Sequence, residues 1–318
     1  MPKVSVVLNA HNGEPWIDEC IQSVLAQTLA DFEFIIVDDG STDGTWAKIN
    51  TYQDSRIRAY TQENRGIAAT ANRGVSLARS TYIARIDQDD VMRPTRLERE
   101  FEFLQANPDV ALVCTYAQLI YENTLSTNEY RAPLSPTALR LRIVFENPIV
   151  QPTVMMRTEV VRALGGYNED HAFFPADDFE LWTRMSRQHK LVTLPEALTR
   201  YRIRPESPSH KMRTVAHNVL ISANSLHWFL AEESTYAECH SLAAIFHRMK
   251  DDIPPLPLKR ALHMFDRVTA IIAGDRHTWD KEVKSVYALQ RRMIFFHHIL
   301  RKKPGRWLAQ HVSALMLR

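Results

Sequence analysis

YIARIDQDD, residues 82–90, joins an apolar run to a turn with three carboxylates. Residues 82–86 have the composition of a buried strand, and Asp87, Asp89 and Asp90 follow it directly. Neighbouring carboxylates repel one another, so a stable fold rarely gathers three at a strand end without a cation. Mg²⁺ and Mn²⁺ prefer such oxygen ligands and usually bind a few carboxylates plus the phosphates of a substrate. A solvated turn that caps the following helix is the alternative explanation.

A second acidic turn, Asp38-Asp39, follows the apolar run Phe34 to Val37. The carboxyl ends of parallel strands share one edge of a sheet, where ligands of open α/β folds bind. The two acidic turns therefore predict a single ligand site at that edge. Helix capping by Asp38, Ser41 or Asp43 individually is also compatible with this stretch.

Short apolar runs alternate with segments of helical periodicity through the first two hundred residues. The predicted strands are 4–8, 34–37, 57–60, 82–86 and 110–120, and the predicted helices are 16–25, one around 46, 67–78 and 94–107. This alternation predicts an α/β fold with a mainly parallel central sheet and helices on both faces. From roughly 130 to 205 the pattern is mixed, and residues 210–318 are predicted to be a helical C-terminal extension.

The composition is that of an ordinary globular protein, with 318 residues, 45% apolar and 24% charged. The three cysteines are far apart, which argues against a disulfide framework or a zinc site and favours a reducing compartment. The first residues do not resemble a signal peptide, and no run of eighteen apolar residues occurs. We expect a soluble, cytoplasmic protein.

Residues 284–318 carry eight Lys or Arg and no Asp or Glu, whereas residues 1–283 carry 31 basic and 37 acidic residues. A basic, aromatic, amphipathic helix suits an anionic membrane surface, which predicts peripheral contact at the inner face of the cell membrane. Packing of this helix on the rest of the protein is the alternative. Nucleic acid is not an expected partner, because the positive charge is local.

A third acidic pair, Asp177-Asp178, begins a predicted helix that contains Leu181, Trp182 and Met185. Acids at a helix start interact favourably with its dipole, so capping is one explanation. A carboxylate beside a metal site could also act as a general base. The spacing leaves both explanations open.

Seven strings occur in order: VSVVLNAHNGEPWIDECIQSVLAQT, IIVDDGSTDGT, ENRGIAATANRG, YIARIDQDD, GGYNED, ADDFELWTRM and YRIRPESPS. Together they resemble the family 2 glycosyltransferases, which have the Rossmann-like GT-A fold that binds nucleotide sugars. Any one string is weak evidence, but seven in the same order are strong evidence. The resemblance implies a GT-A domain at 1–209, with a nucleotide-sugar half at about 1–120 and an acceptor half at about 121–209.

The resemblance also implies residues that bind the nucleotide sugar. Asn9 and His11 match positions near the nucleotide base, and Asp39 matches the acid that hydrogen-bonds it. The loop that contains Asn64 and Gly66 is expected along the nucleotide cleft.

The resemblance implies roles for three further carboxylates. Asp87 is expected toward the ribose and the metal, and Asp89 matches the principal ligand of Mg²⁺ or Mn²⁺. Asp178 matches the catalytic base of inverting members. Asp178 would activate an acceptor hydroxyl, and the nucleoside diphosphate would depart from the opposite face of the sugar.

The implied enzyme moves one sugar from a nucleoside diphosphate donor, with UDP-sugars favoured, to a saccharide or lipid-linked saccharide in cell-surface polysaccharide synthesis. The QxxRW string of processive synthases is absent after Asp178, which favours one transfer per event. A nucleotide-sugar-binding protein without turnover is the alternative. A dinucleotide oxidoreductase is disfavoured because no GxGxxG follows the first predicted strand.

Two positions depart from the family pattern. His11 stands where Tyr is common, and an imidazole can still stack on a base. Arg204 stands where the YRI string often continues with His. A guanidinium cannot ligate a metal but could bind the diphosphate directly, so no histidine ligand is expected.

Overall fold

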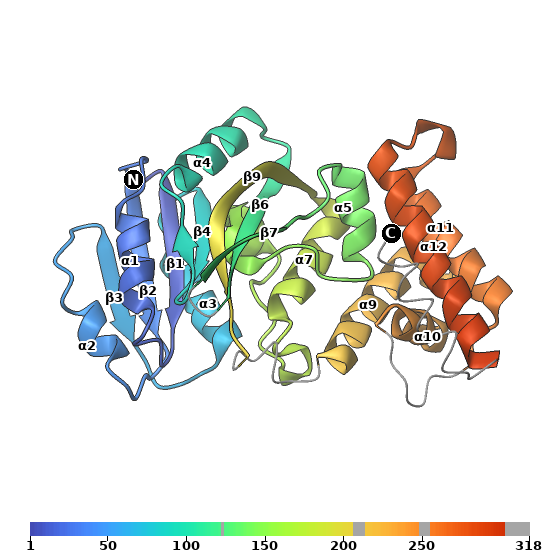
Figure 1. Cartoon of the computed structure of the whole chain (residues 1–318), viewed down its shortest axis with the longest axis horizontal. Coiled ribbons are helices and arrows are strands. Elements are labelled where there is room, and N and C mark those ends of the chain that lie inside the picture. The colour runs from blue at the N-terminus through green and yellow to red at the C-terminus, as the bar shows by residue number, and fades with distance from the viewer. Residues whose placement is uncertain (122–123, 206–213, 248–254, 303–318) are drawn as a thin grey trace. The chain divides into compact units, whose positions relative to one another are not determined.

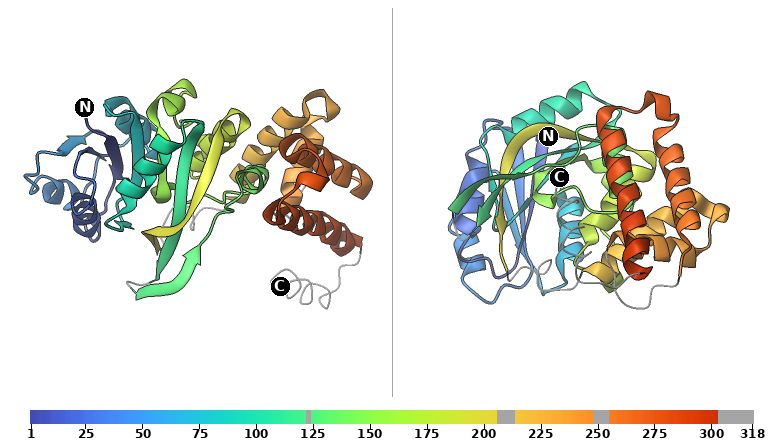
Figure 2. Two further views of the ribbon diagram at one scale, coloured as in Figure 1. Left: turned by 90° about the horizontal axis from the view of Figure 1, so that it is seen from above. Right: turned by 45° about the vertical axis from the view of Figure 1, so that its right-hand side comes forward.

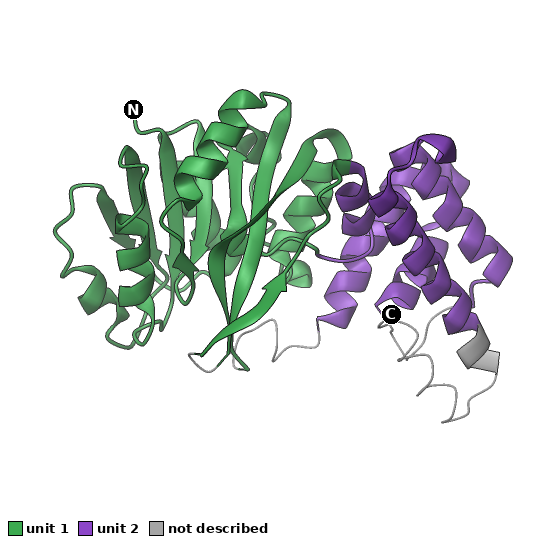
Figure 3. Ribbon diagram, turned by 45° about the horizontal axis from the view of Figure 1, so that its top comes forward, with its two compact units in different colours: residues 1–136, 148–212 green, residues 137–147, 213–318 purple. Residues whose placement is uncertain are grey.

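The computed structural model describes residues 1–121, 124–205, 214–247 and 255–302. The chain divides into two compact units, shown in Figure 3: residues 1–136 with 148–212, and residues 137–147 with 213–318. The first unit is α/β and the second is helical. The predicted boundary between residues 209 and 210 lies outside the described residues.

The α/β unit is built on one sheet with the strand order β3-β2-β1-β4-β8-β6-β9-β5, and β7 pairs with β6 (Figure 1). Its strands are β1 (Val4–Ala10), β2 (Phe32–Asp38), β3 (Ile57–Thr61), β4 (Tyr82–Asp87), β5 (Val91–Met92), β6 (Val110–Tyr121), β7 (Thr124–Tyr130), β8 (Val154–Arg157) and β9 (Lys190–Ile203).

The first half of the sheet is parallel, as predicted, because β3, β2, β1 and β4 pair in parallel. The second half is mixed. The two longest strands, β6 and β9, run parallel and side by side (Figure 2). Strand β8 is antiparallel to its neighbours β4 and β6. Strand β5 pairs antiparallel with β9, and β7 pairs antiparallel with β6. Antiparallel strands need no crossover helix, so the strand–helix alternation breaks down in this half.

Helices cover both faces of the sheet, as predicted. The helices of this unit are α1 (Ile17–Leu25), α2 (Thr45–Ile49), α3 (Ile67–Leu77), α4 (Arg96–Ala106), α6 (Thr158–Ala163) and α7 (Asp177–Gln188), with short 3₁₀ turns η1 (Gln151–Thr153) and η2 (His171–Phe173). Helices α1 and α4 pack on the face that contains Val6, in one buried cluster. Helix α3 lies against β1 at Gly74, where an added Cβ would be 2.3 Å from Val7 Cγ1. Val6 and Val7 are consecutive in β1, so their side chains point to opposite faces.

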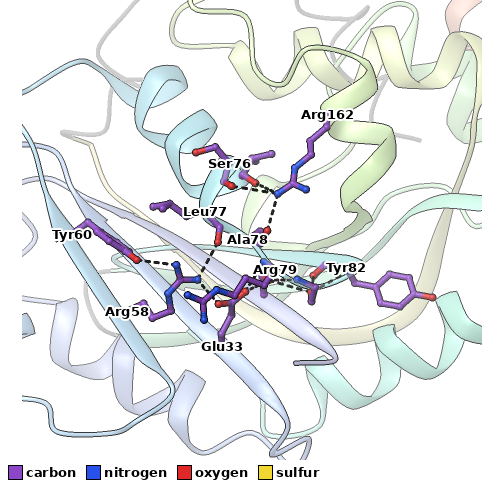
Figure 4. A network of polar contacts seen from close by, with 12 residues as sticks. Glu33, Arg58, Tyr60, Ser76, Leu77, Ala78, Arg79, Tyr82 and Arg162 are labelled. Carbon is purple, nitrogen blue, oxygen red and sulfur yellow. Dashed lines mark hydrogen bonds and ion pairs between the residues drawn. The ribbon is translucent and has the colours of Figure 1, made fainter. Parts of the chain in front are cut away.

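A polar network fixes the end of α3 at the amino edge of the parallel strands (Figure 4). Glu33 accepts hydrogen bonds from Arg58 Nη1 at 2.5 Å and from the Arg79 amide at 2.7 Å. Arg162 Nη2 donates to three carbonyls at the end of α3, those of Ala78 at 2.7 Å, Val75 at 2.9 Å and Ser76 at 3.4 Å. The unpaired carbonyls of a helix end are thereby satisfied, which anchors α3 at the edge opposite to the acidic turns.

The helical unit consists of α5 (Pro136–Ile143), α9 (Val215–Leu230), α10 (Tyr236–Phe246), α11 (Leu258–Ala273) and α12 (Lys281–Lys302), with η3 (Ala231–Glu233) and η4 (Arg276–Thr278). Helix α12 covers the first part of the basic segment 284–318, and residues 303–318 lie outside the described residues. Val283, Tyr287 and Ile294 of α12 are buried in the apolar cluster of this unit. In residues 281–298 the apolar side of the helix therefore packs within its own unit. Within the described residues, no helix has the combination of length and hydropathy that a membrane span requires.

Candidate functional site

The register of the parallel strands gathers the predicted residues at one edge of the sheet. Asn9 of β1 pairs with Asp87 of β4, and the next residue, Ala10, pairs with Asp38 of β2. The acidic turns after β2 and β4 thus lie on either side of the end of β1. The expectation that they share one edge is confirmed.

Asp39 is buried, with 5% of its surface exposed, and it holds the loop before α3. Its Oδ1 accepts hydrogen bonds from Gln62 Nε2 at 2.7 Å and from the Arg65 amide at 2.8 Å, and its Oδ2 accepts one from the Gly66 amide at 2.9 Å. Gly66 has a φ of +88°, a conformation that favours glycine. The carboxylate therefore orders the predicted nucleotide loop, in addition to its expected contact with a base.

His11 lies where this loop meets the end of β2. Its Nδ1 is 2.9 Å from the carbonyl oxygen of Asp39, which can only accept, so we place the ring proton on Nδ1. Its Nε2 then accepts from Asn12 Nδ2 at 3.2 Å, and Asn64 Nδ2 lies 3.3 Å from Nδ1. His11, Asp39 and Asn64 are therefore neighbours, as the resemblance implies.

Asn9 and Asp87 are linked by Arg85, which was not among the predicted site residues. Asn9 Oδ1 accepts from Arg85 Nη1 at 3.2 Å, and Asn9 Nδ2 donates to the Ile67 carbonyl at 3.1 Å. Arg85 is fully buried, and its Nη2 is 3.9 Å from Asp87 Oδ1. The guanidinium also faces the ring of Tyr167 at 5.7 Å. The sequence could have pointed to Arg85, because it is a lone cation inside an otherwise apolar strand.

The three carboxylates of the acidic turn have different surroundings. Asp87 Oδ1 accepts a hydrogen bond from Gln151 Nε2 at 3.3 Å. Desolvation raises the pKa of Asp87, and the charge of Asp89 raises it further, whereas Arg85 lowers it. Asp90 is buried, which raises its pKa well above the usual value.

Asp90 belongs to the interior rather than to a helix cap. Its Oδ1 accepts from the Arg202 amide of β9 at 2.8 Å. Helix α4 has Thr95 at its N-cap and no side-chain cap there. The capping explanation for this turn is therefore wrong, and Asp90 ties β4 to β9 instead.

Asp89 forms an ion pair with Arg204, the residue immediately after β9. Arg204 Nε is 2.5 Å from Asp89 Oδ2, and the guanidinium lies over the Trp16 ring with 4.3 Å between the guanidinium carbon and the ring centroid. Arg202 Nε binds the backbone carbonyl of Asp89 at 2.9 Å. Side chain and backbone of Asp89 are thus held by two different arginines.

The donor set of this turn suits a divalent ion that is shared with a substrate. Among the described residues, no group of three His, Cys, Asp or Glu side chains is placed to hold an ion. Asp87 and Asp89 remain as two carboxylates, which is the number that Mg²⁺ commonly takes when phosphate oxygens and water complete its shell. Asp87 and Asp89 therefore fit a shared ion, provided that Asp89 is released from Arg204.

Asp177 and Asp178 occupy the first turn of α7, and the structure separates them. Asp177 is buried, which raises its pKa to about 6, and its Oδ2 has no hydrogen-bond partner among the described residues. Asp178 is half-buried, and its Oδ1 accepts from the Phe179 amide at 2.6 Å. Asp178 is therefore the more accessible of the two carboxylates.

Tyr201 of β9 was also not among the predicted site residues. Burial raises the pKa of Tyr201, and four carboxylates raise it further: Asp90, Asp87, Asp89 and Asp178. Tyr201 is therefore within electrostatic range of both the acidic turn and the first turn of α7. The two acidic turns thus share one edge of the sheet, and Asp178 is a half-buried carboxylate within electrostatic range of the same tyrosine.

Comparison with known proteins gives matches over the same region. The family model described as Glycosyl transferase family 2 matches residues 5–165. The putative glycosyltransferase EpsE of Bacillus subtilis is 32% identical over 224 residues, which cover 69% of this chain and 78% of that protein. The O-antigen biosynthesis glycosyltransferase WbnJ of Escherichia coli is 31% identical over 210 residues, covering 64% and 81%.

Solved structures resemble nearly the whole chain. S. aureus TarS 1-349 in complex with UDP-GlcNAc has a TM-score of 0.63 at 16% identity, covering 94% of this chain and 91% of that one. The mannosyltransferase PcManGT from Pyrobaculum calidifontis, in complex with GDP-Man and Mn²⁺, has a TM-score of 0.51 at 17% identity, covering 96% and 88%. At these identities the likeness shows the fold, and the predicted GT-A fold with a helical C-terminal part is confirmed.

Proposed function

Because this chain belongs to glycosyl transferase family 2, we propose that it moves a single sugar from a nucleoside diphosphate donor, with UDP-sugars favoured, to a saccharide hydroxyl. The observation that carries the proposal is the strand register, which brings the acidic turns after β2 and β4 to one edge of the sheet on either side of β1. A displacement at a sugar needs charge stabilisation on the leaving diphosphate and a base for the acceptor, and we assign the first to Asp87 and Asp89 with a bound ion and the second to Asp178.

In this proposal, separate residues bind the nucleoside and take the proton of the acceptor. The loop held by Asp39, together with His11 and Asn9, binds the nucleoside. Asp178 takes the proton of the acceptor hydroxyl, whose oxygen attacks the anomeric carbon while the bond to the diphosphate oxygen breaks. Attack from the face opposite to the leaving group inverts the anomeric centre.

We propose Asp89 and Asp87 as the residues that would hold Mg²⁺ or Mn²⁺. When bound, such an ion supplies positive charge to the diphosphate oxygens, a contribution of several kcal/mol to transition-state stabilisation. The two-carboxylate donor set supports this assignment, and PcManGT was solved with Mn²⁺.

We place the reaction in cell-surface polysaccharide synthesis, with a saccharide or lipid-linked saccharide as acceptor. The support is the name of WbnJ, an O-antigen biosynthesis glycosyltransferase. Peripheral membrane contact through residues 284–318 is part of this proposal. Since α12 packs its apolar side within the helical unit, the contact would rest on the sequence beyond residue 302, which includes Lys303, Arg306 and Trp307.

A screen of nucleotide sugars by thermal shift, with and without Mn²⁺, tests the proposal, because a ligand that binds the folded state raises its melting temperature. We expect one UDP-sugar to give the largest shift. The same donor, incubated with oligosaccharide acceptors, should release UDP and form a glycoside detected by mass spectrometry. Donor binding without release of UDP under any acceptor would favour the alternative of a binding protein without turnover, and no binding of any nucleotide sugar would refute both.

A further inference from the structure

The ion pair between Arg204 and Asp89 places a protein cation on the carboxylate that is proposed to hold the divalent ion. We infer that Arg204 competes with the divalent ion for Asp89 and moves to the diphosphate of the donor when the donor binds. Divalent ion and donor then bind together rather than separately. The inference rests on the proposed function and assigns to Arg204 a positioning role at that same site.

The pair is well placed to compete. Arg204 Nε and Asp89 Oδ2 are 2.5 Å apart, and their side chains are only 21% and 13% exposed, so solvent screens their attraction weakly. Stacking on Trp16 at 4.3 Å further stabilises the guanidinium in this position. A divalent ion at Asp89 Oδ2 has to displace this guanidinium, because both need the same oxygen.

Protonation does not relieve this competition, because an arginine keeps its charge at every ordinary pH. The guanidinium does have a second partner of the right shape, since its planar fork matches the oxygens of a phosphate. A donor diphosphate beside Asp89 would draw Arg204 away from the carboxylate. Donor binding would then have two effects at once. It would free Asp89 for a cation, and it would supply the phosphate oxygens that complete the coordination shell of that cation.

The acidic turn does not depend on Arg204 for its shape. Three groups of Arg202 hold the turn. Nε donates to the carbonyl of Asp89 at 2.9 Å, the backbone amide donates to Asp90 Oδ1 at 2.8 Å, and Nη2 donates to Glu19 Oε2 at 2.7 Å. Loss of the Arg204 side chain should therefore free the Asp89 carboxylate while the turn stays in place. This separation makes the inference testable by substitution.

The test is Mn²⁺ binding to the full chain without any donor, measured from the electron paramagnetic resonance signal of free Mn²⁺. We expect Arg204→Ala and Arg204→His to bind Mn²⁺ about tenfold or more tightly than the wild type, the size of effect measured for removal of a close charge partner. Arg204→Lys keeps the positive charge and should stay weak. Equal Mn²⁺ affinities for the wild type, Arg204→Ala and Arg204→His would overturn the inference.

Two controls locate the effect. Arg56→Ala removes the same charge from an ion pair with Asp54 just before β3, at the opposite edge of the sheet, and should bind Mn²⁺ as the wild type does. The double variant Arg204→Ala with Asp89→Asn should lose the gained affinity. If it keeps that affinity, the new Mn²⁺ site is not at Asp89 and the inference fails. Melting temperatures of all variants show that each is folded.

A UDP titration separates this inference from the proposed function. In the presence of a chelator, we expect the wild type to bind UDP about tenfold more tightly than Arg204→Ala, because the guanidinium then binds the diphosphate. A wild type that binds no UDP, with or without Mn²⁺, would refute the proposed function. UDP binding that is unaffected by Arg204→Ala would leave the proposed function intact and overturn the transfer of Arg204 to the diphosphate.

Discussion

The carboxylate of Asp39 accepts a hydrogen bond from the amide of Gly66 at 2.9 Å, which joins the end of β2 to the start of α3. The other carboxylate oxygen accepts from Arg65 and Gln62. Three donors thus converge on one buried anion, and hydrogen bonds to an ionised group are stronger than neutral ones. The position of the nucleotide loop depends on this charge.

Asp39→Asn should loosen that loop. An amide has one acceptor oxygen in place of two, so at least one backbone amide loses its partner. We expect the free energy of unfolding to fall by about 1–3 kcal/mol and UDP binding to weaken. Urea denaturation and calorimetric titration measure the two effects. Asp31→Asn, at an exposed position before β2, is the charge-matched control, and identical behaviour of the two variants would contradict the prediction.

Gly166→Ala should destabilise the turn after α6 more than Gly165→Ala. Both glycines have positive φ, +74° and +80°, so each alanine carries a strain of roughly 1–2 kcal/mol. A Cβ at residue 166 would also lie 2.3 Å from Asn72 Oδ1, and this oxygen accepts a hydrogen bond from the Tyr167 amide at 2.7 Å. A Cβ at residue 165 would meet no atom within 4 Å. We expect an additional loss of about 1 kcal/mol for Gly166→Ala in urea denaturation. Equal losses would show that Asn72 yields without cost.

The parallel half of the sheet could be predicted because its signals are local. Apolar runs such as residues 34–37 and 82–86 end in acids, and the helices between them have clear periodicity. Strand β7 has no such signal, because nearly all of its residues are exposed and polar, and β5 has only two residues. The assignment of residues 137–147 to the helical unit was equally hidden, since it depends on packing with helices that begin near residue 215.

The site residues at strand ends could be predicted from their type and position, whereas their partners could not. Asp89 and Arg204 are 115 residues apart, and Asn9 and Arg85 are 76 apart. Such pairs form only through the register of β1, β4 and β9, which no local pattern encodes. Arg204 stands out in the sequence by its departure from the family pattern, but its ion pair with the proposed metal ligand becomes visible only in the fold.

Asp89→Asn should abolish stimulation of transfer by Mn²⁺, because an amide is a poor ligand in place of a carboxylate. The backbone of residue 89 stays bound to Arg202, so we expect the variant to remain folded, although the loss of the ion pair with Arg204 lowers its melting temperature. Initial rates with Mn²⁺ and with a chelator measure the effect. Asp109→Asn, an exposed acid paired with Lys190 at the start of β9, should keep the wild-type response. Full activity of Asp89→Asn in the presence of chelator would refute the metal assignment.

Glu100 should make stability depend on pH. It is fully buried beside Arg96, with 3.2 Å between Arg96 Nε and Glu100 Oε1, and burial raises its pKa from 4.5 to about 7. The folded state therefore binds the proton more tightly than the unfolded state. The associated stability is present below about pH 4.5 and is lost as the pH rises toward about 7.

Glu100→Gln isolates this effect, because glutamine has nearly the same shape and does not ionise. Each unit of pKa difference corresponds to about 1.4 kcal/mol. We expect urea denaturation between pH 4.5 and 7 to show a smaller loss of stability with rising pH for the variant than for the wild type. Parallel curves for the two proteins would show that Glu100 is ionised in the folded state throughout this range.

Asp178→Asn should separate binding from chemistry. The side chain lies in the first turn of α7, where its Oδ1 accepts from the Phe179 amide, and asparagine can keep that contact. An amide cannot take the proton of the acceptor hydroxyl, so we expect kcat to fall by about 10²–10⁴-fold while the affinity for UDP is unchanged. Glu159→Gln removes an exposed acid from the first turn of α6 and should leave both quantities unaltered. Release of UDP in the presence of acceptor gives kcat, and calorimetric titration gives the affinity. A variant that transfers sugar at the wild-type rate would exclude Asp178 as the base and would direct attention to Asp177, the buried acid beside it.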